Sequence, residues 1–101
     1  MNGDVNAGMN TGDALQCELR IVNEKGLHAR AAARFVRLAE RYDAAIEVCR
    51  DGATVSGNSI MGLMMLAAAS GTTITLRVTG PEAAAALAAL SALVANRFDE
   101  P

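Results

Sequence analysis

Four short stretches of the chain alternate hydrophobic and polar residues, which is the pattern of half-buried strands. They span residues 15–21, 45–49, 53–56 and 72–78. In the first stretch the apolar residues fall on one face, and they are Leu15, Cys17, Leu19 and Ile21. Asp51-Gly52 separates the second stretch from the third, and this dipeptide favours a two-residue hairpin turn. The pattern therefore predicts four strands, with a tight hairpin joining two of them.

Between residues 29 and 41 the hydrophobic spacing changes to that of a helix. Its apolar face consists of Ala32, Phe35, Val36 and Ala39, and its opposite face of Arg30, Arg34, Arg37 and Arg41. A short helix is expected over roughly residues 60–68, because Ser59 is well suited to cap its N-terminus. A last helix starts at Gly80-Pro81-Glu82 with Pro81 in its first turn. Its buried stripe is expected to be Leu87, Leu90 and Val94.

The resulting order βαββαβα predicts an α+β fold, in which a four-stranded antiparallel sheet is covered on one face by three helices. A chain of 101 residues supports a single modest core, so we expect one domain over residues 14–101. Residues 1–13 are rich in Asn and Gly and have no apolar period. They are expected to form a flexible N-terminal tail.

Composition and charge restrict the possible functions. No apolar run approaches the roughly 20 residues that span a bilayer, and no signal peptide is visible, so we expect a cytoplasmic protein without membrane insertion. Five of the nine basic residues lie between residues 25 and 41, where Glu40 is the only acid. This positive face suits phosphoryl groups and acidic protein partners. It is too small, and too poor in aromatic residues, to predict nucleic-acid binding.

Cys17 and Cys49 both fall in predicted strands. Two isolated cysteines in a cytosolic chain are expected to be buried free thiols. With one distant histidine they supply too few ligands for a metal site, so we expect no metal and no cofactor. A reactive thiol would need a cationic neighbour, and Arg50 beside Cys49 is a weak candidate.

The single histidine, His28, stands where a predicted strand has ended and a helix begins. A helix N-terminus offers free backbone N–H groups and the positive end of the macrodipole, which together favour an anion. Imidazole is a nucleophile that can carry a phosphoryl group, and Arg30 lies close enough in sequence to pair with its charge. The alternative is a surface histidine that only caps the helix.

Two segments resemble the HPr family, the histidine phosphocarriers of the bacterial phosphotransferase system. Residues 26–30 (Gly-Leu-His-Ala-Arg) and the following residues 32–36 are similar to the family's active-site segment. Residues 56–64 are similar to its regulatory-serine segment and lie at the family's spacing from the histidine. The likeness runs from about Leu15 to about Phe98. Most members have proline where this chain has Ala31, a change that preserves the helix and adds one amide donor.

The resemblance implies the HPr-like open-faced sandwich with strand order 1-4-2-3, and a phosphocarrier that is not itself an enzyme. His28 would accept the phosphoryl group on Nδ1, as a pros-phosphohistidine. The Arg30 guanidinium and the amides of Ala29, Arg30 and Ala31 would stabilise its charge. Enzyme I, which draws on phosphoenolpyruvate, would be the donor and an Enzyme IIA the acceptor. The carrier is expected to be a monomer.

The resemblance also implies roles for the second helix. Ile60, Met61 and Met64 would line a docking patch for partner proteins, whereas Leu63 and Leu66 suit the core better. Ser59 would be phosphorylated by an HPr kinase/phosphorylase, or else it only caps the helix.

Two other functions fit the fold less well. A purely regulatory binding protein of the same fold would act through protein contacts alone, but such relatives lack the active histidine. A ferredoxin-like module that binds small molecules would normally stop at βαββαβ. The chain has no Mg²⁺ cage and no glycine-rich nucleotide loop, so we do not expect it to use ATP directly. The choice between sugar uptake and a nitrogen-related regulatory phosphorelay stays open.

Overall fold

The structure is a computed structural model that describes residues 14–100, so the tail predicted for residues 1–13 lies outside the described part. The strands are β1 (Leu15–Arg20), β2 (Ala45–Arg50), β3 (Ala53–Ser56) and β4 (Thr73–Thr79). The helices are α2 (Ala29–Ala39), α3 (Ile60–Met65) and α4 (Ala83–Ala95), and a short turn, η2 (Arg97–Asp99), follows them. The predicted order βαββαβα is confirmed.

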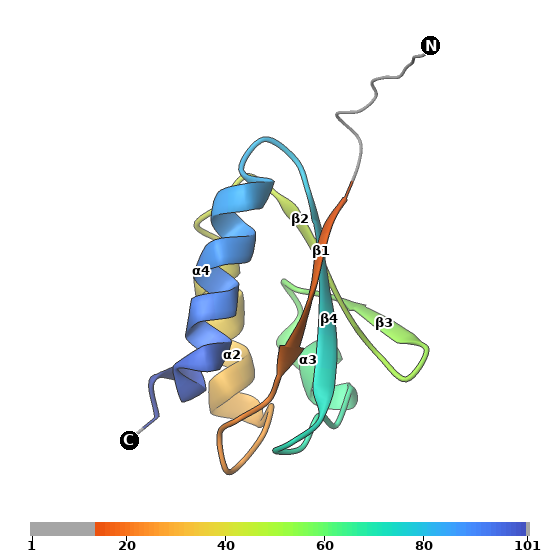
Figure 1. Ribbon diagram of the computed structural model, residues 1–101, viewed down its shortest axis with the longest axis vertical. Helices are drawn as coiled ribbons and strands as arrows, with labels where there is room; N and C mark the ends of the chain where they lie inside the picture. The colour runs from red at the N-terminus through yellow and green to blue at the C-terminus, as the bar shows by residue number, and fades with distance from the viewer. Residues whose placement is uncertain (1–13, 101) are drawn as a thin grey trace.

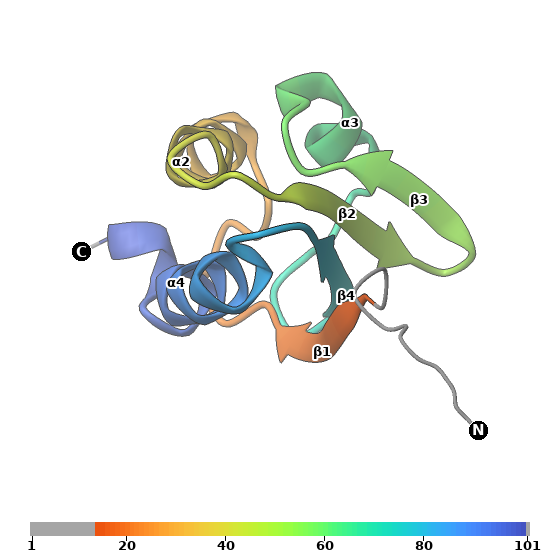
Figure 2. The ribbon, with the colours of Figure 1, turned by 90° about the horizontal axis from the view of Figure 1, so that it is seen from above.

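The four strands form one antiparallel sheet in the order β1-β4-β2-β3. All three helices lie on the same side of this sheet, and its other face is left open (Figures 1 and 2). This arrangement confirms both the open-faced sandwich and the strand order that the resemblance implied. The β2–β3 hairpin turns at Asp51 and Gly52, with φ angles of 49° and 83°. Positive φ at both positions is the geometry that the Asp-Gly dipeptide predicted.

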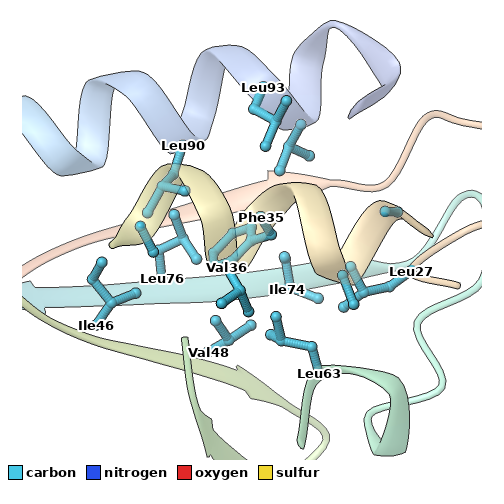
Figure 3. Close-up of a cluster of buried hydrophobic side chains, with 14 of the residues drawn as sticks. Leu27, Phe35, Val36, Ile46, Val48, Leu63, Ile74, Leu76, Leu90 and Leu93 are labelled. Carbon is cyan, nitrogen blue, oxygen red and sulfur yellow. The ribbon is translucent and has the colours of Figure 1, made fainter. Parts of the chain in front are cut away.

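The core lies between the helices and the inner face of the sheet. Figure 3 shows Phe35 and Val36 of α2 among side chains of β4 and α4, including Leu76 and Leu90. Phe35, Leu76 and Leu90 have no exposed surface. Burial of one such large apolar side chain stabilises the fold by about 1.5–3 kcal/mol. On α4, the buried alanines Ala83 and Ala86 are small enough for the helix to approach the sheet closely.

Several boundaries differ from the prediction. Helix α3 ends at Met65 rather than near residue 68, because Ala67 takes a positive φ of 52° that a helix cannot contain. Pro81 lies in the turn before α4, not in its first turn. The helix starts later because Glu82 has non-helical angles and its carboxylate accepts the Asp43 N–H at 2.6 Å.

Two apolar side chains of the predicted elements are only partly buried. Leu87 of α4 is half-buried. Leu15 is 40% exposed, because it begins a strand at the edge of the sheet.

The turn η2 has no counterpart in the sequence prediction. Arg97, Phe98 and Asp99 take φ angles of 58°, 54° and 61°, a left-handed conformation that is costly for side chains other than glycine. Surrounding contacts must hold such a conformation in place. Here Phe98 is fully buried in the core, and the Arg34 guanidinium of α2 donates a hydrogen bond to the Phe98 carbonyl oxygen. The chain after α4 is thereby fixed beside α2.

Candidate functional site

His28 is the N-cap residue of α2, so its ring stands at the exposed start of the helix. The loop before it is held in place on two sides. Gly26 has a φ of 67°, and a Cβ atom there would lie 2.5 Å from the Ala68 carbonyl oxygen, so only glycine fits. Leu27 is buried, and its N–H donates to that same oxygen at 2.9 Å. These contacts join the His28 loop to the segment that follows α3.

Both nitrogens of the His28 ring are engaged. Nδ1 accepts a hydrogen bond from the Arg30 N–H at 3.3 Å, and Nε2 is hydrogen-bonded to a carboxylate oxygen of Glu100. An ionised carboxylate can only accept, so Nε2 carries the proton. Nδ1 then keeps its lone pair, as its contact with an N–H donor also requires. The neutral ring therefore has its proton on Nε2 and its lone pair on Nδ1.

Glu100 is the main site residue that the sequence analysis missed. Its side chain is 17% exposed, against 27% for that of His28. The hydrogen bond from His28 lowers the pKa of the Glu100 carboxyl, while burial opposes the shift and Asn23 adds to it. No local pattern marks this residue, because 72 positions separate it from His28.

A cavity of about 250 Å³ opens beside the ring. Its lining combines four cations with two acids, an amide and the histidine, and consists of Asn23, Glu24, Lys25, His28, Arg30, Arg34, Arg97 and Glu100. The positive excess suits a phosphoryl group. His28 and Arg30 were predicted from the sequence to belong to the site, and the structure brings the two together here. Lys25 and Arg97 also line the cavity, and the sequence did not predict a role in the site for either.

The residues expected to bind the phosphoryl charge through their amides differ in accessibility. Ala29 and Arg30 are exposed, whereas Ala31 has no exposed surface. The first intrahelical bond of α2 comes from Ala32, whose N–H donates to the His28 carbonyl oxygen. The amides before it are those that a helix leaves without an intrahelical partner.

Helix α3 presents a second surface, which does not line the His28 cavity. The Ser59 hydroxyl accepts the Gly62 N–H at 2.9 Å, which confirms Ser59 as the N-cap. Leu63 and Leu66 are buried, as predicted. The exposed apolar side chains of this helix are Ile60 at 40%, Met61 at 70%, Met64 at 40% and Met65 at 78%.

Both cysteines are free thiols, but neither is fully buried, which corrects the prediction. Cys17 lies 3.6 Å from the Ser91 hydroxyl of α4. Cys49 lies 3.3 Å from the Thr54 hydroxyl on the paired strand. Arg50 is engaged elsewhere, because its guanidinium donates to the Leu66 carbonyl oxygen at the end of α3.

Within residues 14–100, no group of three or more His, Cys, Asp or Glu side chains is placed to hold a metal ion. In the same part of the chain, no helix combines the length and apolarity that crossing a membrane requires.

Comparison with known proteins matches this chain to a family. The family model described as PTS HPr component phosphorylation site matches residues 15–96. The phosphocarrier protein HPr of Cupriavidus necator is 48% identical over 86 residues, which cover 85% of this chain and 97% of that protein. The phosphocarrier protein HPr of Pseudomonas aeruginosa is 50% identical over 84 residues, or 82% and 93% of the two chains.

Solved structures agree with the sequence relatives. The phosphocarrier protein HPr from Bacillus anthracis superposes with a TM-score of 0.77 at 43% identity, over 80% of this chain and 96% of that one. An HPr structure from Thermoanaerobacter tengcongensis gives a TM-score of 0.82 at 36% identity, over 86% and 98% of the two chains. This chain therefore belongs to the HPr family of the phosphotransferase system, whose members are phosphocarrier proteins and not enzymes.

Proposed function

We propose that His28 accepts a phosphoryl group on Nδ1 from Enzyme I, which draws on phosphoenolpyruvate, and passes it to an Enzyme IIA. The observation that carries this proposal is the hydrogen bonding of the ring, which leaves the lone pair on Nδ1. That lone pair attacks the phosphorus atom of the phosphorylated donor. The N–P bond forms as the bond to the donor breaks, and the donor keeps the electron pair.

The phosphoryl charge is stabilised at the start of α2. The Arg30 N–H, which contacts Nδ1 in the free protein, passes to a phosphoryl oxygen. The exposed Ala29 amide and the Arg30 guanidinium supply further donors. The Ala31 amide lies deeper, so it contributes mainly through the helix dipole, or binds directly after a small local shift.

Partner proteins dock on the apolar face of α3 formed by Ile60, Met61 and Met64. These side chains are exposed although they are apolar, and flexible methionines suit a surface that accepts several partners. Ser59 stands at the start of this surface. Its phosphorylation by an HPr kinase/phosphorylase would add about −1.5 to −2 charge at pH 7. We propose that this charge weakens docking.

We place the carrier in the cytoplasm as a monomer. Two free thiols fit a reducing compartment. Related structures include one described as an HPr dimer from Thermoanaerobacter tengcongensis, and size-exclusion chromatography with light scattering would distinguish the proposed monomer from such a dimer.

Labelling with Enzyme I and phosphoenolpyruvate carrying ³²P tests the proposal. Because His28 is the only histidine, His28→Ala is expected to abolish acid-labile labelling. His28→Asn is the matched control for folding, since asparagine is a preferred N-cap residue but has no nucleophilic ring nitrogen. This variant should melt near the wild-type temperature and also remain unlabelled. Acid-labile label in either variant would overturn the assignment, and an unlabelled wild type would favour a purely regulatory binding protein.

A further inference from the structure

We propose that Asn23 and Glu100 are positioning residues for His28. In this arrangement Asn23 holds the Glu100 carboxylate, and the carboxylate holds the proton on Nε2 throughout phosphoryl transfer. The inference rests on the proposed function, and it adds a requirement for two residues that are 77 positions apart in the sequence but in contact in the fold.

Asn23 is only 1% exposed, and its amide group does two things at once. Nδ2 donates to the Gly26 carbonyl oxygen at 2.7 Å and to Glu100 Oε1 at 3.2 Å. The orientation of the amide is fixed, because a flip would place Oδ1 against two acceptors. The first bond anchors Asn23 to the loop that carries His28, and the second orients the carboxylate.

The other amide atom of Asn23 indicates that this residue is not placed for stability alone. Oδ1 is buried and has no hydrogen-bond partner within the described residues. A buried acceptor without a partner destabilises the fold, and each such group calls for an explanation. We infer that Asn23 is retained because its Nδ2 orients the Glu100 carboxylate, although the unpartnered Oδ1 destabilises the fold.

Glu100 is brought to the site by the left-handed turn η2. The turn is held by burial of Phe98 and by the hydrogen bond from Arg34 to its carbonyl oxygen. Glu100 follows directly and meets the ring of His28. A strained backbone that delivers a side chain to a reactive group is typical of functional sites.

The chemistry requires the Nε2 proton to stay in place. When Nδ1 bonds to phosphorus, the ring gains a positive charge that it shares with Nε2–H, and the adjacent carboxylate stabilises this charge. When the group is passed on, the N–P bond breaks, the electron pair returns to Nδ1, and the ring is again neutral with its proton on Nε2. No proton enters or leaves the site in either direction.

Other charged groups also face this pair. Lys25 and the cavity arginines Arg30, Arg34 and Arg97 favour the ionised carboxylate, while Glu24 opposes it. Because the pKa of Glu100 is lowered, its carboxyl group stays ionised through the pH range in which an ordinary glutamate is protonated. The contact is lost only as the pH falls through the lowered pKa.

The test compares Glu100→Gln with Glu24→Gln. Both variants remove one negative charge from the lining of the same cavity, but of these two glutamates it is Glu100 that is hydrogen-bonded to Nε2 of His28. Glu100→Gln is expected to slow transfer from phosphorylated Enzyme I about tenfold, because a neutral amide oxygen replaces the charged acceptor of the hydrogen bond from Nε2. Transfer from this variant to Enzyme IIA should fall off at a lower pH than transfer from the wild type, because the phosphorylated ring loses the Nε2 proton more easily. Glu24→Gln should leave both the rate and the pH profile near those of the wild type.

Asn23→Ala provides a second test of the positioning role. It is expected to slow transfer and shift the pH profile in the same direction as Glu100→Gln. Glu100→Asp keeps the carboxylate, so its pH profile should lie between those of Glu100→Gln and the wild type. ¹⁵N NMR of His28 should report protonated Nε2 in the neutral wild-type ring and a mixture of tautomers in Asn23→Ala. Identical rates and pH profiles in Glu100→Gln, Glu24→Gln and the wild type would overturn the positioning role while leaving the carrier function intact. Failure of the wild type to accept the phosphoryl group would instead overturn the proposed function.

Discussion

Arg30 and Arg34 lie one turn apart on α2, yet their guanidinium groups have different environments. Arg34 is half-buried and is held by the Phe98 carbonyl oxygen. Arg30 is exposed and lines the cavity beside His28, and no hydrogen bond or ion pair within residues 14–100 holds its guanidinium. Arg30 can therefore turn toward an incoming anion, whereas Arg34 maintains the turn that carries Glu100.

Replacement of Arg30 tests this difference. Arg30→Ala is expected to slow phosphoryl transfer from Enzyme I by about tenfold or more, since it removes a charged donor to the phosphoryl group. Arg41→Ala is the control, because Arg41 is an exposed arginine just beyond the other end of α2. Its transfer rate should stay within about twofold of the wild type, as for a solvated surface charge. Equal small effects in steady-state transfer assays would exclude a role for Arg30.

At the scale of one element, α3 combines a structural face with an exposed apolar face. Leu63 and Leu66 anchor it in the core, and Gly62 approaches β3 so closely that a Cβ atom would lie 3.1 Å from the Val55 Cβ. Met61 and Met65 point into solvent. Six residues make too short a helix to be stable alone, so Ser59 capping and the Arg50 bond to the Leu66 carbonyl oxygen both matter.

Two variants of Ser59 separate its capping role from its proposed regulatory role. Ser59→Ala is expected to lose about 1 kcal/mol of unfolding free energy while transferring almost normally. Ser59→Asp keeps an N-cap oxygen and should hold the melting temperature, but its charge at the apolar surface should weaken transfer from Enzyme I. Ala84→Asp is the matched control, because it adds the same charge to the exposed first turn of α4. If Ser59→Asp transfers as fast as Ala84→Asp, Ser59 is a helix cap only.

The elements themselves could be predicted because their signals are local. Alternation marked the strands, helical spacing marked α2, and Asp51-Gly52 marked the hairpin. His28 and Ser59 could be placed at helix starts for the same reason, whereas the regulatory role of Ser59 came from the resemblance to the HPr family.

The rest of the site depends on contacts that no local pattern encodes. The positive φ angles of η2 involve no glycine, so the turn carries no glycine signal and is fixed by burial of Phe98 and by Arg34. Glu100 then meets His28 across 72 positions and Asn23 across 77. The burial of Ala31 is a further example, because the packing of α2 against the core leaves this residue of the proposed phosphoryl site with no exposed surface.

For the whole molecule, the fold gathers the proposed chemistry at one end. The start of α2 and the helix α3 lie near each other at the end where the β1–α2 and α3–β4 loops turn (Figure 1). The Leu27 bond to Ala68 links these segments directly. A partner that covers the exposed face of α3 would thus lie next to the cationic cavity that holds His28. The open face of the sheet plays no part in the proposed transfer.

In the proposed function Nδ1 of His28 carries the phosphoryl group, and NMR of the phosphorylated protein identifies that atom. Uniformly ¹⁵N-labelled protein would be treated with Enzyme I and phosphoenolpyruvate, and the ring nitrogens of His28 would be assigned before and after the reaction. We expect the phosphoryl group on Nδ1 and the proton retained on Nε2. Phosphorylation on Nε2, or on any residue other than His28, would exclude the proposed role of Nδ1.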